Sequence, residues 1–163
     1  MTRAPALEID VVIECGRWPS DAAATVRRAV EEAAKAVKQS CAGRALAVLL
    51  TDDAAIRRLN ATWRGIDKPT NVLSFPAPQT SAAPAPLGDI AIAYETAARE
   101  AETEGKPLSH HLAHLSVHGF LHLLGYDHAS DAQADAMENL ERKALAALGV
   151  PDPYLAPREA AGV

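Results

Sequence analysis

The 163-residue sequence predicts a single α+β domain, in which a small mixed sheet of about four strands packs against about five helices. Segments typical of strands and of helices both occur, but they do not alternate regularly. The last third of the chain contains only segments typical of helices. A chain of this length can bury one sizeable core. We expect the domain to span residues 1–150 and to be followed by a loosely ordered tail at 151–163.

The first half of the chain predicts two strands and two helices. Residues 7–14 alternate and are rich in Ile and Val, which is typical of a strand. Ser20 or Asp21 can cap a helix that runs to about Lys38. Residues 44–50 predict a second, apolar strand, and the hydroxyl and carboxyl groups at 51–53 then predict the start of a short helix that ends near 61.

The second half predicts two more strands, at 72–75 and 87–94. Between them, the segment 76–86 contains four prolines and predicts a surface loop. Three helices follow, at 95–104, 108–124 and 131–148. Gly105 and Gly149 stand where the first and the last of these helices are expected to end. The middle helix carries enough leucine to be buried against the sheet.

All six histidines lie between positions 110 and 128, and three of them have the spacing of a metal site. His118 and His122 are four residues apart, so they stack one turn apart on one helix face. Gly125 stands where a helix commonly ends, and the resulting reversal could bring His128 round as a third ligand. Three protein ligands leave open the position where a catalytic zinc binds water. We therefore predict one zinc ion per chain at the C-terminal end of this helix.

His114 lies one turn before His118, so a ligand set of His114, His118 and His122 is an alternative. On a straight helix the outer two would be about 12 Å apart along the axis. Zn–N bonds of about 2.0–2.1 Å make it hard for both to reach one ion. We therefore expect His114 to contact a metal ligand without binding the ion itself, or to face the substrate. His110 and His111 are expected at the solvent or near the mouth of the site.

The ligand spacing is also that of metzincin peptidases, with one departure. Gly119 stands where those enzymes carry the glutamate that acts as general base. A zinc peptidase is therefore an alternative function, but this chain lacks the general base that such an enzyme uses.

Charge and composition narrow the function classes. The net charge of −5 argues against a protein that coats nucleic acid through general electrostatics, although 57–68 holds four basic residues and one acidic residue. The longest apolar run, 45–50, is too short to span a bilayer, and the N-terminus lacks the apolar region of a secretory signal. Cys15 and Cys41 are isolated, which favours reduced thiols. We expect a cytoplasmic protein with no membrane partner.

Three segments together resemble the YbeY family of bacterial rRNA maturation endoribonucleases. They are LNATWRGIDKPTNVLSFP at 59–76, LGDI at 87–90, and HLSVH through GYDH at 114–128. The resemblance implies one zinc held by His118, His122 and His128, and metal-dependent cleavage of single-stranded RNA. It implies a role in rRNA processing, notably 3′ end maturation of 16S rRNA, and in ribosome quality control. The implied partners are the small ribosomal subunit and its assembly proteins, with no DNA.

The resemblance suggests a role for Arg64, and the chemistry of other polar side chains suggests further candidates. Arg64 matches the arginine that the family places near its RNA-binding cleft, where its planar guanidinium could clamp a phosphate oxygen. Asp127 could orient a histidine ring or a water, or it could be a turn or cap residue. Arg64, His114 and Asp127 are thus the candidate catalytic residues. The candidates for substrate binding are Arg64, Lys68, Thr70, Asn71 and Ser74, and structural roles stay open for the last three.

A third class of function is a ribosome-assembly factor without turnover, whose zinc is structural. In that case a protein side chain should occupy the fourth zinc position.

Overall fold

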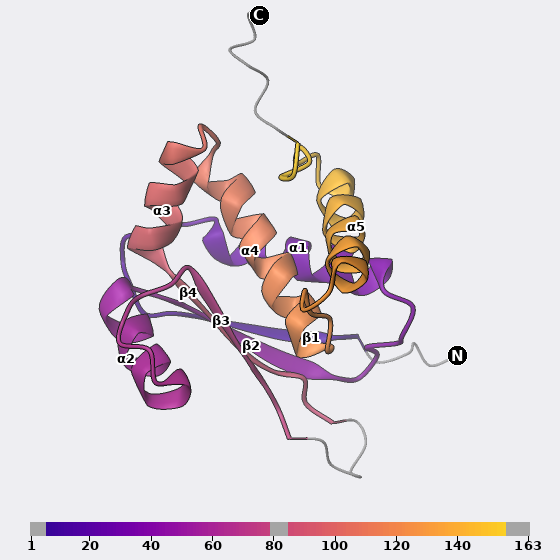
Figure 1. Cartoon of the computed structure of the whole chain (residues 1–163), viewed down its shortest axis with the longest axis horizontal. Helices are drawn as coiled ribbons and strands as arrows, with labels where there is room; N and C mark the ends of the chain where they lie inside the picture. The colour runs from indigo at the N-terminus through magenta and orange to yellow at the C-terminus, as the bar shows by residue number, and fades with distance from the viewer. Residues whose placement is uncertain (1–5, 79–84, 156–163) are drawn as a thin grey trace, which may run out of the picture.

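The computed structural model describes residues 6–78 and 85–155, and it confirms the predicted α+β class. Four strands form its sheet in the order β1-β2-β4-β3 (Figure 1). Their bounds are β1 Glu8–Ile13, β2 Ala45–Thr51, β3 Val72–Pro76 and β4 Gly88–Ala93. Strand β2 is parallel to both of its neighbours, β1 and β4. Strand β3 lies at the edge and runs antiparallel to β4.

Five helices complete the described part of the chain. Their bounds are α1 Ala22–Ala36, α2 Asp53–Arg64, α3 Tyr94–Thr103, α4 Leu108–Leu123 and α5 Asp131–Ala147. The predicted end of α2 near 61 is wrong by three residues, because the helix continues until Gly65 adopts a left-handed conformation with φ of 70°. None of the described helices combines the length and the apolar character needed to cross a membrane.

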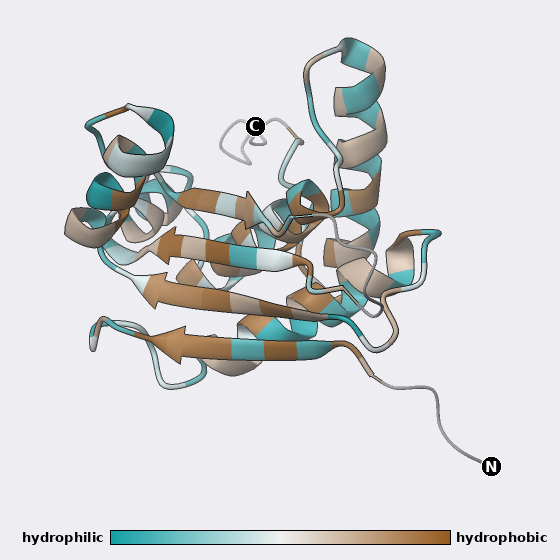
Figure 2. Cartoon of the chain, turned by 90° about the horizontal axis from the view of Figure 1, so that it is seen from below, coloured by the Kyte–Doolittle hydropathy of each residue, from teal (hydrophilic) through white to brown (hydrophobic). Residues whose placement is uncertain are grey.

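The two faces of the sheet are covered differently. One face packs on α1 and α4, with α5 behind them, and Val48, Leu50 and Ile90 are fully buried in this main core. On the other face, α2 covers only the end near Leu73 and Ala91. Figure 2 views the sheet from this second side and shows apolar strand residues that no helix covers.

Helix α4 is the central helix of the main core, and most of its side chains are buried. It approaches the sheet closely at Gly119, where an added Cβ would lie 2.9 Å from Ile90 Cγ2 and 3.2 Å from Ser74 Oγ. These distances are shorter than nearly all real Cβ contacts, so a larger side chain would push the helix outward. Position 119 therefore faces the sheet.

The end of α4 reverses the chain as the sequence predicts. Gly125 has φ of 95°, and its N–H donates to the carbonyl of His122. The N–H of Tyr126 donates to the carbonyl of Leu121. This pair of hydrogen bonds is the Schellman motif, which turns the chain back over the last turn of a helix. His128 follows three residues after the glycine.

Candidate metal centre

The reversal at Gly125 brings His128 next to the two histidines on α4. One ring nitrogen from each of His118, His122 and His128 lies within 4.8 Å of the others. The Nε2 atoms of His118 and His122 are 3.0 Å apart. Three imidazoles that converge in this way could hold one metal ion.

The three side chains fit a zinc ion in spacing and in chemistry. Two nitrogens bonded to one tetrahedral zinc at about 2.0–2.1 Å stand roughly 3.3 Å apart, close to the separation of the two Nε2 atoms. Burial lowers the pKa of His122, and the neighbouring rings of His118 and His128 lower it further. The neutral ring is the form that binds a metal. His128 is exposed, so the cluster opens to solvent on that side.

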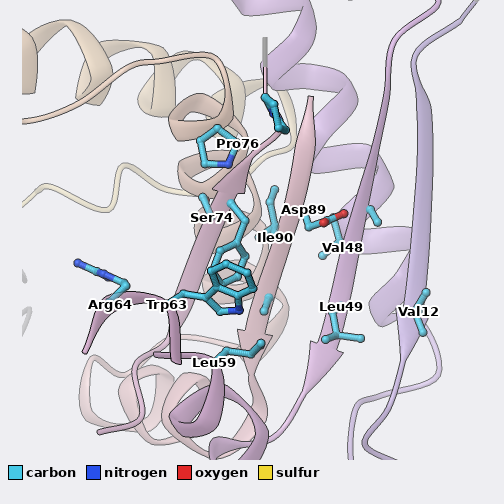
Figure 3. Close-up of a pocket in the computed structure, with 14 residues that line it drawn as sticks. Val12, Val48, Leu49, Leu59, Trp63, Arg64, Ser74, Pro76, Asp89 and Ile90 are labelled. Atoms are coloured by element: carbon cyan, nitrogen blue, oxygen red, sulfur yellow. The ribbon is translucent and has the colours of Figure 1, made fainter. Parts of the chain in front are cut away.

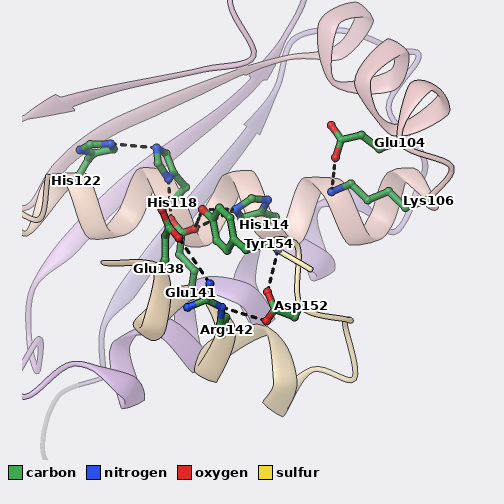
Figure 4. A network of polar contacts seen from close by, with 10 residues as sticks. All are labelled: Glu104, Lys106, His114, His118, His122, Glu138, Glu141, Arg142, Asp152 and Tyr154. Carbon is green, nitrogen blue, oxygen red and sulfur yellow. Dashed lines mark hydrogen bonds and ion pairs between the residues drawn. The ribbon is translucent and has the colours of Figure 1, made fainter. Parts of the chain in front are cut away.

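A buried carboxylate lies behind the histidine cluster. Glu141 of α5 is completely buried, and its Oε2 accepts a hydrogen bond from His118 Nδ1 over 2.7 Å. Its Oε1 accepts from His114 Nε2 over 3.0 Å and also from the hydroxyl of Tyr154 (Figure 4). Burial alone would raise the pKa of Glu141, but the hydrogen bonds from these three side chains outweigh it and lower the pKa to about 2. The carboxylate is therefore ionised.

The other three histidines of α4 differ in burial, and only His111 is fully buried. His114 is directed toward Glu141 and Tyr154 instead of the three converging rings. The expectation for His111 is wrong, because its side chain is buried and its Nε2 pairs with Glu100 Oε1 over 2.8 Å. It lies on the face of α4 that packs on α3. His110 is half-buried near the start of α4.

Asp127 is exposed beside His128. Its Oδ1 accepts a hydrogen bond from the backbone N–H of His128 over 2.8 Å, and the same oxygen is 3.6 Å from the Nδ1 of that ring. The ring contact is longer than a hydrogen bond.

Arg64 lies at the rim of a groove of about 930 Å³ on the uncovered face of the sheet. Trp63, Phe75 and Asp89 also line this groove, and Trp63 is 69% exposed. Figure 3 shows the guanidinium of Arg64 directed away from Trp63, at the edge of the groove. Ser74 lines the groove too, while its Oγ donates to the carbonyl of Gly119 over 3.0 Å. Ser74 thus links β3, which borders the groove, to α4, which carries His118 and His122.

The remaining candidates for substrate binding lie in and after the loop that follows α2. Lys68 is exposed, and its backbone carbonyl accepts a hydrogen bond from Asn60 Nδ2 over 2.9 Å. Thr70 is half-buried. Asn71 Nδ2 donates to Glu100 Oε1 over 2.9 Å, so this amide connects the start of β3 to α3. Arg64 and Ser74 line the groove, whereas the Asn71 amide holds the fold together.

Sequence reasoning missed Glu141, Tyr154 and Trp63. Glu141 belongs to a group of acidic residues on α5 that resembles an ordinary solvated helix face. Its neighbour Glu138 is half-buried and Lys143 is exposed, so only the packing of α5 on α4 distinguishes Glu141. Tyr154 falls in the predicted tail; Asp152 and Tyr154 make defined contacts, while 156–163 lie outside the described residues. Residues 79–84 of the predicted 76–86 loop also lie outside them.

Comparison with known proteins places this arrangement in a family. The family described as Endoribonuclease YbeY matches residues 15–149. A protein of that name from Rhodopseudomonas palustris (strain BisA53) is 61% identical over 155 residues, which cover 92% of this chain and 90% of the relative. Another, from Nitrobacter hamburgensis, is 62% identical over 161 residues, which cover 95% of this chain and 84% of the relative.

A solved structure shows the same fold. The solution structure of TM1509 from Thermotoga maritima matches with a TM-score of 0.57 at 22% identity, covering 92% of this chain and 98% of that chain. The likeness supports the architecture described above. From the match over most of its length, and from the high identity to curated relatives, this chain belongs to the YbeY family of endoribonucleases.

Proposed function

We propose that the protein is a zinc-dependent endoribonuclease that cuts single-stranded RNA. The proposal includes a role in rRNA processing, with 3′ end maturation of 16S rRNA, and in ribosome quality control. It also includes a cytoplasmic location and contact with the small ribosomal subunit and its assembly proteins. Membership of the family supports these assignments.

The observation that carries the proposal is the convergence of three imidazole nitrogens. Arg64 and the exposed Trp63 line the groove on the uncovered face of the sheet. His118, His122 and His128 offer three ligands, and no fourth His, Cys, Asp or Glu of residues 6–78 and 85–155 joins their group. A three-ligand site keeps a position for water or substrate, whereas a structural zinc is closed by four protein ligands. This count favours a catalytic metal over the structural zinc of a non-catalytic assembly factor.

The chain's own residues have separable tasks in RNA cleavage. When bound, zinc would activate a water molecule and polarise a phosphoryl oxygen. The neutral imidazole rings of His118, His122 and His128 would hold the ion. Arg64 would bind a non-bridging phosphate oxygen from the groove side, because its guanidinium offers paired N–H donors. Trp63, exposed beside it, offers a flat surface on which an unpaired base can stack.

The peptidase alternative loses support from the position of Gly119. The glutamate base of a metzincin must face the metal and the substrate. Here a Cβ added at residue 119 would lie 2.9 Å from Ile90 Cγ2 and 3.3 Å from Ile90 Cδ1, so a side chain at this position would point into the sheet. The glycine that replaces the metzincin glutamate therefore stands at a position that faces the sheet.

The test is single-turnover cleavage of an RNA that contains the 3′ end of 16S rRNA and its precursor extension. We expect His118→Ala to abolish cleavage, because it removes one of three metal ligands. Arg64→Glu should reduce the cleavage rate by at least about 100-fold, since a phosphate clamp becomes a repulsive charge. Arg58→Glu is the matched control, because Arg58 is exposed on the same helix and undergoes the same charge change. Wild-type rates in both His118→Ala and Arg64→Glu would overturn the proposal.

A further inference from the structure

Glu141 is a carboxylate in a place where carboxylates are rare. It is completely buried between α5 and α4, and a buried charge is costly unless other groups pair with it. Its two oxygens accept hydrogen bonds from three donors: His118 Nδ1, His114 Nε2 and the hydroxyl of Tyr154. A carboxylate with this many donors is a fixed acceptor for each of them.

The contact with His118 decides which nitrogen of that ring carries the proton. A carboxylate 2.7 Å from Nδ1 favours the proton on Nδ1, since the ionised oxygen can only accept. Nε2 then keeps its lone pair. That lone pair lies on the side of the ring facing His122, whose Nε2 is 3.0 Å away. The ring is thereby held in the form and orientation that a metal ion needs.

The chain after α5 completes the environment of Glu141. Asp152 accepts a hydrogen bond from Arg142 Nε over 3.0 Å and one from the backbone N–H of Tyr154 over 2.8 Å. The guanidinium carbon of Arg142 lies 5.2 Å from the centre of the Tyr154 ring. These contacts direct the Tyr154 hydroxyl toward Glu141 (Figure 4). The C-terminal segment thus reaches the back of the histidine cluster.

We propose that Glu141 is a positioning residue for the metal centre: it fixes His118 in its metal-binding tautomer, and Tyr154 holds the carboxylate in place. The inference rests on the proposed metal site, and it adds α5 and the segment at 150–155 to the parts of the chain that this site requires. His114 belongs to the same group as a second donor to the carboxylate.

The test measures zinc affinity, by competition with a chromophoric chelator, separately from RNA cleavage. Glu141→Gln keeps the size of the side chain and removes its charge, and we expect zinc affinity to fall by about 10- to 100-fold. Tyr154→Phe removes only the hydroxyl and should lower the affinity by a smaller factor. Glu138→Gln is the matched control, because Glu138 lies one turn earlier on α5 and pairs with Arg142 instead of a histidine. Its zinc affinity should stay within about twofold of wild type.

The tautomer of His118 gives a second measurement, by nitrogen–proton correlation NMR of the metal-free wild-type protein. We expect the proton on Nδ1. A proton on Nε2 would overturn the inference even if Glu141→Gln fails to fold. An affinity of folded Glu141→Gln within about twofold of wild type would also overturn it. If the wild-type protein binds no zinc, the proposed function fails instead, so the two failures are distinguishable.

Discussion

The hydroxyl of Ser74 donates a hydrogen bond to the backbone carbonyl of Gly119 over 3.0 Å, which fixes the edge strand β3 to the turn of α4 that carries His118. Ser74 also lines the groove that contains Arg64. One hydrogen bond therefore connects the strand beside the groove to the helix that carries the metal site. The distance between the two regions depends on how closely α4 approaches β3 and β4.

Gly119→Ala tests this close approach. The added Cβ would lie 2.9 Å from Ile90 Cγ2, so either Ile90 or the helix must move. We expect a loss of about 1–3 kcal/mol in the free energy of unfolding, as for other overpacked cores. Urea denaturation of the metal-free protein measures it. Gly16→Ala is the control, because an added Cβ there meets nothing within 4 Å. Equal stability of Gly119→Ala and wild type would show that the helix has room to adjust.

Gly125→Ala tests the reversal that delivers His128. Gly125 has φ of 95°, and a left-handed conformation costs an L-residue roughly 1–2 kcal/mol. Gly149 ends α5 with φ of 74°, so Gly149→Ala introduces a similar strain away from the histidine cluster. We expect both variants to lose stability but only Gly125→Ala to lose zinc affinity, which a chelator competition measures. Equal zinc affinities in the two variants would contradict this role of Gly125.

The histidine helix could be predicted from sequence because its signals are local. The four-residue spacing of His118 and His122 and the glycine at 125 act within one or two helical turns. The three-residue error at the end of α2 also concerns a local signal, because Gly65 and not Ala61 marks the end of that helix. Local patterns therefore indicate the elements and the three converging histidines.

The groups around the histidines could not be predicted, because they depend on packing between distant segments. Glu141 is 23 residues from His118 in the chain, and its sequence neighbourhood is that of a charged surface helix. The burial of His111 depends on Glu100 of α3, which accepts hydrogen bonds from both His111 and Asn71. The strand order, with β4 between β2 and β3, likewise follows from pairings that no local pattern encodes.

Metal removal should lower the stability of the folded protein. A ligand that binds only the folded state stabilises it by about 2.7 kcal/mol at one hundred times its dissociation constant. We expect zinc to raise the melting temperature of the wild-type protein, and a chelator to reverse this effect. His128→Ala should remove most of the zinc-dependent increase. His110→Ala is the control, because that histidine lies at the other end of α4. An undiminished increase in His128→Ala would show that His128 is not a ligand.

The buried ring of His111 should make stability depend on pH. Burial lowers its pKa most, and Lys106 lowers it further, whereas Glu100 and Glu104 raise it without reversing the shift. His114 is the other titratable ring that faces it, with the ring centres 6.2 Å apart. The folded protein therefore keeps this ring neutral at a pH where the unfolded chain, with an ordinary histidine pKa of about 6.5, already binds a proton.

Because the unfolded state binds more protons in this window, the contribution of His111 to stability is present above about pH 6.5 and declines as the pH falls below it. His111→Gln has no titrating ring. We expect the wild-type protein to lose stability relative to this variant as the pH decreases from about 7.5 to about 5, through the unfolded pKa. Urea denaturation of both metal-free proteins across that range measures the difference. A difference in unfolding free energy that stays constant with pH would show that His111 titrates alike in the folded and unfolded states.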